Sequence, residues 1–301
     1  MKTIGILGST GSVGQQSLKV INNHNKKFDV KFLAANSNVD QLIEQTKNNN
    51  PKYICIYDKS KYNKLKDNVS NVKILSGFEG LMELCELSNV DIILNAISGY
   101  SGLEPTLKII ESGTDIALSN KESIVQAGHL VMDLAKSMNV NIFPVDSEHS
   151  ALWQCMVGEN KSRIRKIILT ASGGPFRTLS RNDFSKITVQ QALNHPNWKM
   201  GKKISIDSAT LMNKVFEIIE AKNIFNLPYN KIKVLIHPNS YVHCLIKFKS
   251  GLIKIIAHET TMKIPILNTL YSDKQNKLIK SKIDFNSLNN LSLAEVSILR
   301  Y

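Results

Sequence analysis

Short apolar runs alternate with amphipathic segments along the first 145 residues. The apolar runs cover residues 3–8, 30–36, 53–57, 90–97, 115–119 and 141–146. Segments at 15–24, 39–47, 103–113 and 122–137 instead carry apolar residues at helical spacing. Continuous apolar strands separated by helices are typical of a parallel sheet covered on both faces. The pattern predicts a doubly wound, Rossmann-like α/β domain.

The pattern changes after residue 150. Apolar runs at 164–172, 233–238, 241–249 and 252–258 predict strands of an antiparallel or mixed sheet, and residues 213–225 predict a helix. Residues from Lys274 to Asn290 are polar and linker-like. We therefore predict an α/β domain over 1–149, an α+β domain over 150–273, and a linker over 274–301.

Composition restricts the class of protein. The chain has 301 residues, 43% of them hydrophobic, which is enough for the cores of about two domains. No run of ~18 apolar residues occurs, and a strand pattern begins at Thr3, so we expect a cytoplasmic protein without a membrane span. The four cysteines form no CxxC pair and are expected to be reduced core residues.

The net charge of +13 raises the question of nucleic-acid binding, but only five of the 38 basic residues are arginine. Base and phosphate recognition relies heavily on arginine, and no motif interleaves aromatic with basic residues. We exclude nucleic acid as the expected partner. A lysine-rich surface still attracts phosphorylated or carboxylated small molecules.

A glycine-rich loop follows the first predicted strand. GILGSTGSVG, residues 5–14, has the spacing GxxGxxG and opens a helix, which suits a dinucleotide pyrophosphate, although a structural turn is the alternative. The second strand ends in Asn36, Ser37 and Asn38, with no acid to bind the 2′-hydroxyl of NAD. The absence of an acid favours NADP over NAD, although no basic residue is present there to bind the 2′-phosphate of NADP.

Two acids flank Ser147 in PVDSEHSALWQ, residues 144–154. If PVD ends a strand, alternation places Asp146 and Glu148 on one side, where their charges repel unless a cation lies between them. A distant lysine, a divalent metal and plain water are the candidates. Glu217 offers a third carboxylate, and an all-oxygen set favours Mg²⁺ or Mn²⁺. Zinc is disfavoured, because the histidines lack an HxxxH pair.

Other polar groups follow predicted strands or begin predicted helices. These groups are Lys121 with Glu122, Ser172 with the amides of Gly173 and Gly174, and Ser208 with Asn213 and Lys214. Each group alone also fits a surface ion pair, a tight turn or a solvated face. Serine, asparagine and lysine near the start of a helix nevertheless suit a phosphate.

Several long motifs occur in order: GSTGSVG, SNKES, PVDSEHSA, TASGGPF, HPNWKMGKKISIDSATLMNK and VLIHPNSYVH. With these motifs the chain closely resembles the 1-deoxy-D-xylulose 5-phosphate reductoisomerase family. The resemblance implies an NADPH-binding domain, a catalytic domain with a mobile flap near 194–201, and a C-terminal helical domain. We expect that last domain to be missing here, because the sequence stops at LAEVSILRY.

The resemblance also implies roles for individual residues. The metal ligands are Asp146, Glu148 and Glu217, which with Lys121 and His195 are the catalytic residues. The substrate-binding residues are Lys121, Ser147, Glu148, Ser172, His195, Trp198, Ser208, Asn213, Lys214 and Glu217, with Trp198 and Met200 in the flap. The cofactor-binding residues are Thr10, Gly11, Ser12, Val13, Asn36, Asn38, Asn120, Glu122 and Gly201.

The implied reaction rearranges 1-deoxy-D-xylulose 5-phosphate, by retro-aldol cleavage and re-aldol joining, and reduces the aldehyde with NADPH to 2-C-methyl-D-erythritol 4-phosphate, for isoprenoid synthesis. The metal serves as Lewis acid and template. The resemblance further implies a homodimer acting on a small phosphorylated sugar.

Three departures from the family pattern qualify this expectation. Ser37 stands where relatives often carry a basic residue, which predicts a reduced preference for NADPH over NADH. Val215 replaces a usual glycine, and HETTMKIPI differs from GxxDMRxPI. With the missing domain, these predict impaired turnover in isolation. The alternatives are a catalytically impaired NADP-binding remnant and a same-fold oxidoreductase acting on another phosphorylated carbonyl compound.

Overall fold

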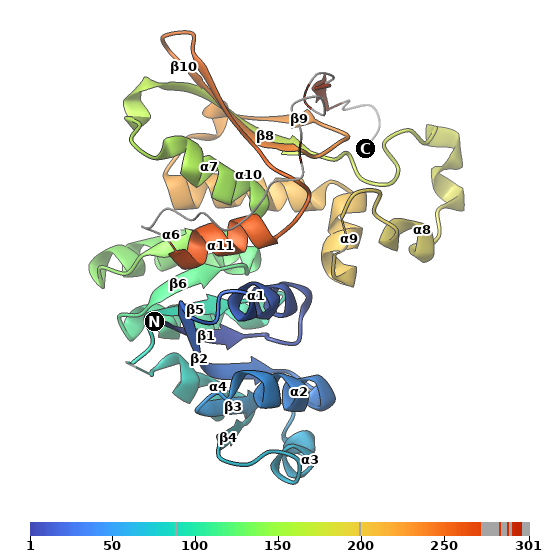
Figure 1. Ribbon diagram of the computed structural model, residues 1–301. Helices are drawn as coiled ribbons and strands as arrows, with labels where there is room; N and C mark the ends of the chain where they lie inside the picture. Colours follow the sequence, from blue (N-terminus) through green and yellow to red (C-terminus); the bar gives the residue numbers. More distant parts are fainter. Residues whose placement is uncertain (88, 199, 272–282, 284–287, 289–290, 297–301) are drawn as a thin grey trace. The chain divides into compact units, whose positions relative to one another are not determined.

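The computed structural model of the protein divides into two compact units (Figure 1). It describes residues 1–271 except 88 and 199, together with residues 283, 288 and 291–296. Unit 1 contains Met1–Val145 and Ile266–Ser272, and unit 2 contains Asp146–Pro265 and Asp273–Tyr301. Among the described residues, no helix is long and apolar enough to cross a membrane.

Unit 1 is built on a seven-stranded parallel sheet of order β4-β3-β2-β1-β5-β6-β7. Its strands are β1 (Lys2–Leu7), β2 (Phe28–Ala35), β3 (Tyr53–Ile56), β4 (Lys73–Ser76), β5 (Ile92–Asn95), β6 (Asp115–Leu118) and β7 (Ile142–Pro144). The predicted doubly wound domain is confirmed. The pattern analysis missed β4, whose four residues are exposed or half-buried at the sheet edge and therefore carry a weak apolar signal.

Helices connect these parallel strands, as crossover connections require. They are α1 (Ser12–Asn22), α2 (Val39–Asn49), α3 (Tyr62–Lys66), α4 (Gly77–Cys85), α5 (Leu103–Glu111) and α6 (Lys121–Ser137), with short 3-10 turns η1 (Lys59–Lys61) and η2 (Tyr100–Gly102). From β1 the chain first winds outward to β4, then returns to the other side of β1 as β5. This reversal lies between β1 and β5, where doubly wound sheets bind ligands at the carboxyl ends of their strands.

Unit 2 contains a mixed five-stranded sheet of order β11-β10-β8-β9-β12. Its strands are β8 (Ile164–Ala171), β9 (Ile232–Ile236), β10 (Val242–Phe248), β11 (Ile253–Ala257) and β12 (Ala294–Glu295). Strand β8 pairs parallel with β9 and antiparallel with β10, which confirms the expected mixed sheet.

The helices of unit 2 are α7 (Ser147–Met156), α8 (Val189–Leu193), α9 (Lys202–Ala209), α10 (Met212–Phe225) and the start of α11 (Lys263–Tyr271). Three 3-10 turns are η3 (Lys161–Arg163), η4 (Arg181–Lys186) and η5 (Tyr229–Lys231). Apolar side chains of α7 and α10 share one core with β8 and β10, formed by residues such as Leu152, Phe225, Leu169 and Ile246. This core holds α7 and α10 on the same sheet.

The division between the units falls after Val145, whereas the sequence placed the domain boundary after residue 149. The end of α11 also belongs to unit 1, because Ile266, Leu267 and Leu270 are buried and Thr269 Oγ1 donates to the carbonyl of Pro144 at 3.2 Å. Most of the predicted linker over 274–301 lies outside the described residues. The described part includes β12, which pairs antiparallel with β9.

Candidate active site

The two acids around Ser147 lie at a helix start, not along a strand. Strand β7 ends at Pro144, and Asp146 caps α7 by accepting the N–H of Glu148 at 3.2 Å. The strand-alternation argument was therefore wrong. The carboxylates are close because one caps the first helical turn that carries the other. The helix N-terminus also favours negative charge there.

Helix α10 supplies the third carboxylate. Glu217 is 1% exposed, and its ligand oxygen lies with those of Asp146 and Glu148 in a group in which all three atoms are within 4.8 Å of one another. Asn213, one turn earlier on α10, donates its side-chain N–H to Glu217 Oε1 at 2.5 Å. The structure thus brings together the three acids that the sequence separates by about 70 positions.

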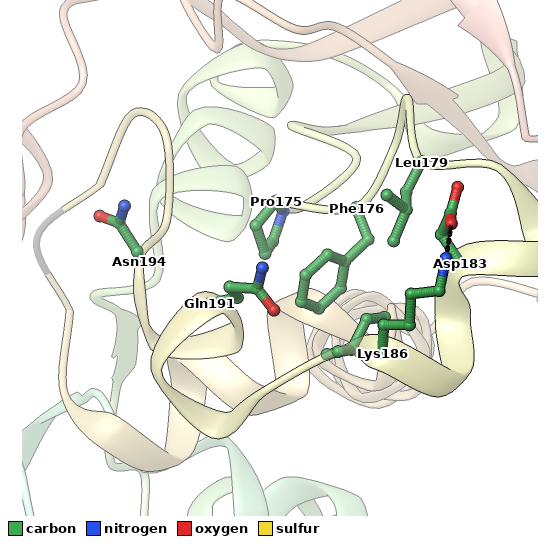
Figure 2. Close-up of a pocket in the computed structure, with 8 residues that line it drawn as sticks. Pro175, Phe176, Leu179, Asp183, Lys186, Gln191 and Asn194 are labelled. Atoms are coloured by element: carbon green, nitrogen blue, oxygen red, sulfur yellow. Dashed lines mark hydrogen bonds and ion pairs between the residues drawn. The ribbon is translucent and has the colours of Figure 1, made fainter.

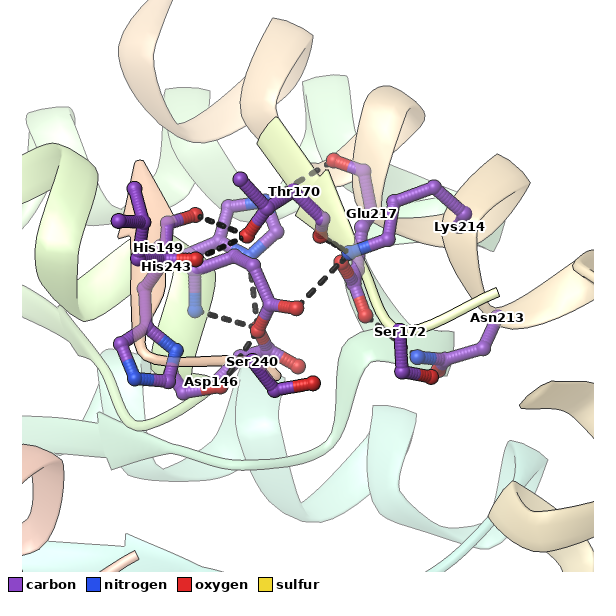
Figure 3. A network of polar contacts seen from close by, with 12 residues as sticks. Asp146, His149, Thr170, Ser172, Asn213, Lys214, Glu217, Ser240 and His243 are labelled. Atoms are coloured by element: carbon purple, nitrogen blue, oxygen red, sulfur yellow. Dashed lines mark hydrogen bonds and ion pairs between the residues drawn. The ribbon is translucent and has the colours of Figure 1, made fainter. Parts of the chain in front are cut away.

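Lys214 lies among these carboxylates (Figure 3). Its Nζ donates to Glu148 Oε1 at 2.8 Å, to Glu217 Oε2, and to the backbone carbonyl of Thr170 at 2.5 Å. Only 5% of Lys214 is exposed. The lysine position follows from α10, whose N-cap residue Leu211 has a φ of 58°, a left-handed conformation that is uncommon for leucine and marks local strain.

The cluster shifts the pKa values of its members. Burial, and then the neighbouring Glu217 charge, raise the pKa of Glu148 to about 7, although Lys214 acts in the opposite direction. Burial alone lowers the pKa of Lys214, but the charges of Glu148 and Glu217 outweigh it, so the pKa lies above its usual value. The ammonium therefore stays charged at neutral pH.

A second buried layer backs the carboxylates. His149 is fully buried; its Nδ1 lies 3.2 Å from Asp146 Oδ1 and 3.4 Å from Glu220 Oε2, while Nε2 donates to the carbonyl of Glu217 at 2.9 Å. Burial lowers the pKa of His149, but Glu220 and Asp146 outweigh it and raise the pKa to about 9. His149 thus links two of the acids.

His149 and Glu220 were not predicted as site residues from the sequence. The signal was present as spacing alone, since His149 follows Asp146 by three residues and Glu220 follows Glu217 by three, each one helical turn away. Such spacing is common on ordinary helix surfaces. Only the packing of α7 against α10 distinguishes it.

The all-oxygen donor set fits a hard divalent cation. Asp146, Glu148 and Glu217 each offer a ligand oxygen, and these three atoms lie within 4.8 Å of one another. Burial raises the pKa of Glu148 most, and the charges of Glu217 and Asp146 raise it further. A second group of potential ligands, Asp146, His149 and Glu220, shares Asp146 with the first.

The loop after β8 forms a second polar group. Ser172 Oγ lies 2.8 Å from His195 Nε2 and accepts the N–H of Gly174 at 3.2 Å. Gly174 has a φ of +68°, and a Cβ there would lie 2.7 Å from the carbonyl oxygen of Ser208. This close approach, which requires glycine, brings the Ser172 loop against the end of α9 that carries Ser208.

His195 is held neutral by its contacts. Its Nδ1 accepts the backbone N–H groups of Asn197 at 3.1 Å and Trp198 at 3.0 Å, so the proton resides on Nε2, which donates to Ser172. Burial, and then the charge of Arg177, lower the pKa of His195 to about 4. At neutral pH the imidazole is a hydrogen-bond donor without charge.

The predicted flap also contacts the loop between β9 and β10. Asn197 Nδ2 donates to the carbonyl of Pro238 and to Ser240 Oγ, the latter at 3.0 Å. The Trp198 ring meets the edge of His243 with 6.1 Å between ring centroids. The described flap residues are therefore anchored within unit 2.

A cavity of about 480 Å³ lies beside α8 (Figure 2). Its lining contains none of the predicted site residues and consists of Pro175, Phe176, Leu179, Asp183, Lys186, Ile187, Gln191 and Asn194.

The glycine loop of unit 1 is built by close backbone contacts. A Cβ at Gly14 would lie 2.4 Å from the carbonyl oxygen of Gly8, whose φ is +76°. Ser9 Oγ donates to Gln45 Oε1 at 2.7 Å, and Gln45 Nε2 returns a bond to the Ser9 carbonyl at 2.9 Å. Gly11 is the N-cap of α1 and has no side chain to occupy the helix N-terminus. Thr10, Ser12 and Val13 lie in this turn.

The other cofactor candidates of unit 1 differ in the exposure and hydrogen bonding of their side chains. Asn36 and Asn38 are exposed, and Asn38 caps α2 by accepting the N–H of Gln41 at 3.3 Å. Asn120 is 1% exposed; it caps α6 and donates to the carbonyls of Ile97 and Gly99 at 2.6 and 2.8 Å. Its side chain thus serves the fold.

Lys121 and Glu122 follow Asn120 in the first turn of α6, and Lys121 is 7% exposed. Both belong to unit 1, whereas Gly201, Met200 and the acids belong to unit 2.

Comparison with known proteins agrees along the whole chain. The family described as 1-deoxy-D-xylulose 5-phosphate reductoisomerase matches residues 4–128, and the C-terminal domain of the same reductoisomerase matches residues 142–225. A 1-deoxy-D-xylulose 5-phosphate reductoisomerase of Clostridium kluyveri is 45% identical over 99% of this chain and 78% of its own length. That of Pelagibacter ubique is 46% identical over 100% and 78%.

Solved structures agree with these sequences. A DOX-P reductoisomerase crystallised with NADPH, fosmidomycin and magnesium superposes with a TM-score of 0.94 at 37% identity, covering 100% of this chain and 77% of that one. The enzyme of Zymomonas mobilis with NADPH gives 0.91 at 38% identity, covering 99% and 78%. Fold and site define the class as an oxidoreductase with a doubly wound domain and a carboxylate-rich catalytic unit. The chain belongs to the 1-deoxy-D-xylulose 5-phosphate reductoisomerase family.

Proposed function

We infer that this chain catalyses the NADPH- and divalent-metal-dependent conversion of 1-deoxy-D-xylulose 5-phosphate to 2-C-methyl-D-erythritol 4-phosphate. The observation that carries the inference is the meeting of Asp146, Glu148 and Glu217 within 4.8 Å in a member of this family. Relatives crystallised with NADPH, fosmidomycin and magnesium support the same cofactors here.

Asp146, Glu148 and Glu217 are the proposed metal ligands. A Mg²⁺ or Mn²⁺ ion held there would supply Lewis acidity for the rearrangement of the substrate. His149 holds Asp146 and the backbone of Glu217 in register, and Asn213 orients Glu217, so the ligands are positioned before substrate arrives.

The remaining residues of unit 2 bind the substrate in this proposal. Ser172, Ser208 and Asn213 contribute neutral hydrogen-bond donors, and Lys214 contributes a charge, which together suit a phosphate or a polyol oxygen. His195 donates from Nε2 because its other nitrogen accepts two backbone N–H groups. It stays neutral because burial, and then the charge of Arg177, lower its pKa. Trp198 and Met200 in the flap exclude water from the reacting carbons.

The cofactor residues of unit 1 bind NADPH mainly through backbone. The N-terminus of α1 and the loop amides near Gly11 meet the pyrophosphate, and exposed Asn36, Ser37 and Asn38 meet the 2′-phosphate. Because these three side chains carry no charge, we expect NADPH to be preferred over NADH by a smaller margin than a basic residue would give. Glu122 and Gly201 keep their proposed cofactor roles, and Asn120 keeps its role through its backbone, because its buried side chain serves the fold.

Two alternatives are not favoured. A substrate other than deoxyxylulose phosphate, or a non-catalytic remnant, has no support from relatives that share 45% identity over nearly the whole chain. Assembly as a homodimer and a cytoplasmic location stay predictions, as does the three-part division of the chain at residues 149 and 273.

The test is NADPH oxidation at 340 nm with 1-deoxy-D-xylulose 5-phosphate, with Mg²⁺ or Mn²⁺ and with EDTA. We expect turnover with either metal and loss of it with EDTA, and a higher kcat/KM for NADPH than for NADH. Metal-independent turnover, or no turnover of this substrate, would contradict the proposal.

A further inference from the structure

Lys214 is bound as a cation in its own site. An ammonium has three protons to donate, and those of Lys214 go to Glu148 Oε1 at 2.8 Å, to Glu217 Oε2 and to the Thr170 carbonyl at 2.5 Å. Because the side chain is buried, water does not compete for these bonds. The site satisfies the ammonium completely.

The same carboxylates belong to the proposed metal site. Glu148 and Glu217 are two of the three acids whose oxygens lie within 4.8 Å of one another. A Mg²⁺ ion ligated by them sits ~2.0–2.1 Å from each ligand oxygen. An ammonium that contacts a shared oxygen at 2.8 Å would lie no more than about 5 Å from that ion, where like charges in a buried site repel strongly. The lysine and the ion therefore compete for two carboxylates.

We propose that Lys214 is an exchangeable internal cation: its ammonium balances Glu148 and Glu217 until a divalent ion displaces it, and it then turns to the phosphorylated substrate. The inference rests on the proposed metal-dependent function and adds an order to it. The metal must bind before Lys214 can serve the substrate. The flexible four-carbon stem allows the ammonium to move while α10 stays in place.

This exchange lowers the apparent metal affinity. A site that is competent for only a fraction of the time binds its ligand more weakly by that fraction. Removing Lys214 removes the competitor, so the metal should bind more tightly even though substrate binding is lost. A lysine that merely holds the carboxylates in position predicts the opposite, because its removal would let them separate.

The test is Mn²⁺ binding to the full chain by calorimetry, after EDTA treatment and without substrate or NADPH. We expect Lys214→Met to bind Mn²⁺ roughly tenfold more tightly than the wild type, if the exchange leaves about a tenth of the sites competent. The control is Lys254→Met, which removes a lysine from a carboxylate pair of the same unit, 3.4 Å from Glu159, and should leave the affinity unchanged. Equal or weaker binding by Lys214→Met would overturn the proposal.

A second measurement uses only the wild type, so it does not depend on the folding of a variant. It distinguishes displacement of the Lys214 ammonium by the metal from simple repulsion between the two cations. Wild-type crystals grown with EDTA and with Mn²⁺ are compared at Lys214. We expect Nζ to move beyond about 4 Å from both glutamates, past ion-pair range, when Mn²⁺ is bound. If both contacts persist beside the bound ion, then Lys214 is not exchanged and the proposal fails.

Neither measurement uses turnover, so the two failures are distinguishable. If Mn²⁺ displaces Lys214 but deoxyxylulose phosphate is not converted, the exchange stands and the proposed reaction fails. If the reaction proceeds while Lys214 stays bonded to both glutamates beside bound Mn²⁺, the proposed reaction stands and the exchange fails.

Discussion

The glycine loop of unit 1 and the carboxylate cluster of unit 2 are two ways of building a polar site. The loop is continuous in sequence, and its form follows from backbone contacts such as Gly8 against Gly14. The cluster joins residues of α7, β8 and α10, and its form follows from charges that satisfy one another. One site is made of neutral backbone donors, and the other of buried ions.

The difference shows which changes each site tolerates. A site built from backbone donors loses function when an added side-chain atom displaces the backbone, whether or not the added group is charged. A buried ionic site tolerates small changes of volume better than the loss of one charge, because an unbalanced buried charge costs free energy. The predictions below test whether the two sites respond in these separate ways.

The largest effect is expected for Glu217→Gln. The amide keeps the size of the side chain but removes one negative ligand, and we expect metal-dependent turnover to fall by at least ~10²-fold, by analogy with loss of an electrostatic transition-state contact. Steady-state NADPH oxidation with saturating Mg²⁺ measures it, and circular dichroism verifies folding. Glu159→Gln, at a half-buried ion pair of unit 2, should retain wild-type turnover. A Glu217→Gln variant as active as the wild type would remove Glu217 from the metal site.

Gly14→Ala should damage the other site alone. The added Cβ would lie 2.4 Å from the Gly8 carbonyl oxygen and 2.6 Å from Ser9 Cα, so the loop must shift. We expect about 1–3 kcal/mol lower stability, as for other overpacked sites, and weaker NADPH binding in a fluorescence titration. Mn²⁺ affinity in unit 2 should not change. Lys19→Ala, on the exposed face of α1, is the control. Normal NADPH affinity in Gly14→Ala would show that the loop does not carry the cofactor.

The remaining prediction concerns the pH dependence of His195, which leaves turnover at neutral pH unchanged. Its folded pKa of about 4 lies below the ordinary value of 6.5, so between these values the folded chain binds fewer protons than the unfolded chain. Stability from this group is therefore present above pH 6.5 and is lost as the pH falls toward 4, with a slope of at most about 1.4 kcal/mol per pH unit. Urea unfolding at several pH values should show a shallower acid decline for His195→Asn than for the wild type. Parallel curves would indicate that His195 titrates normally.

The sequence by itself determined the elements and the motifs. Strands appear in a sequence as alternating or continuous apolar runs, and helices as apolar residues with a period of 3.6. These patterns involve only residues close together in sequence. The parallel sheet of unit 1 and the mixed sheet of unit 2 could therefore be predicted. It also supplied the three acids and the phosphate-type residues as candidates, and the resemblance assigned their roles. The weak edge strand β4 was lost because an exposed edge has little apolar pattern.

Tertiary structure decided how those residues meet. The cap that places Asp146 beside Glu148 replaced a strand, because β7 ends at Pro144. The role of Lys214 depends on α10 and β8 sharing one core, which brings its ammonium to Thr170 and Glu148, 44 and 66 positions away in sequence. His149 and Glu220 joined the site for the same reason. Local pattern records which face of an element is buried, but the pairing of buried charges depends on distances across the core, which no local pattern contains.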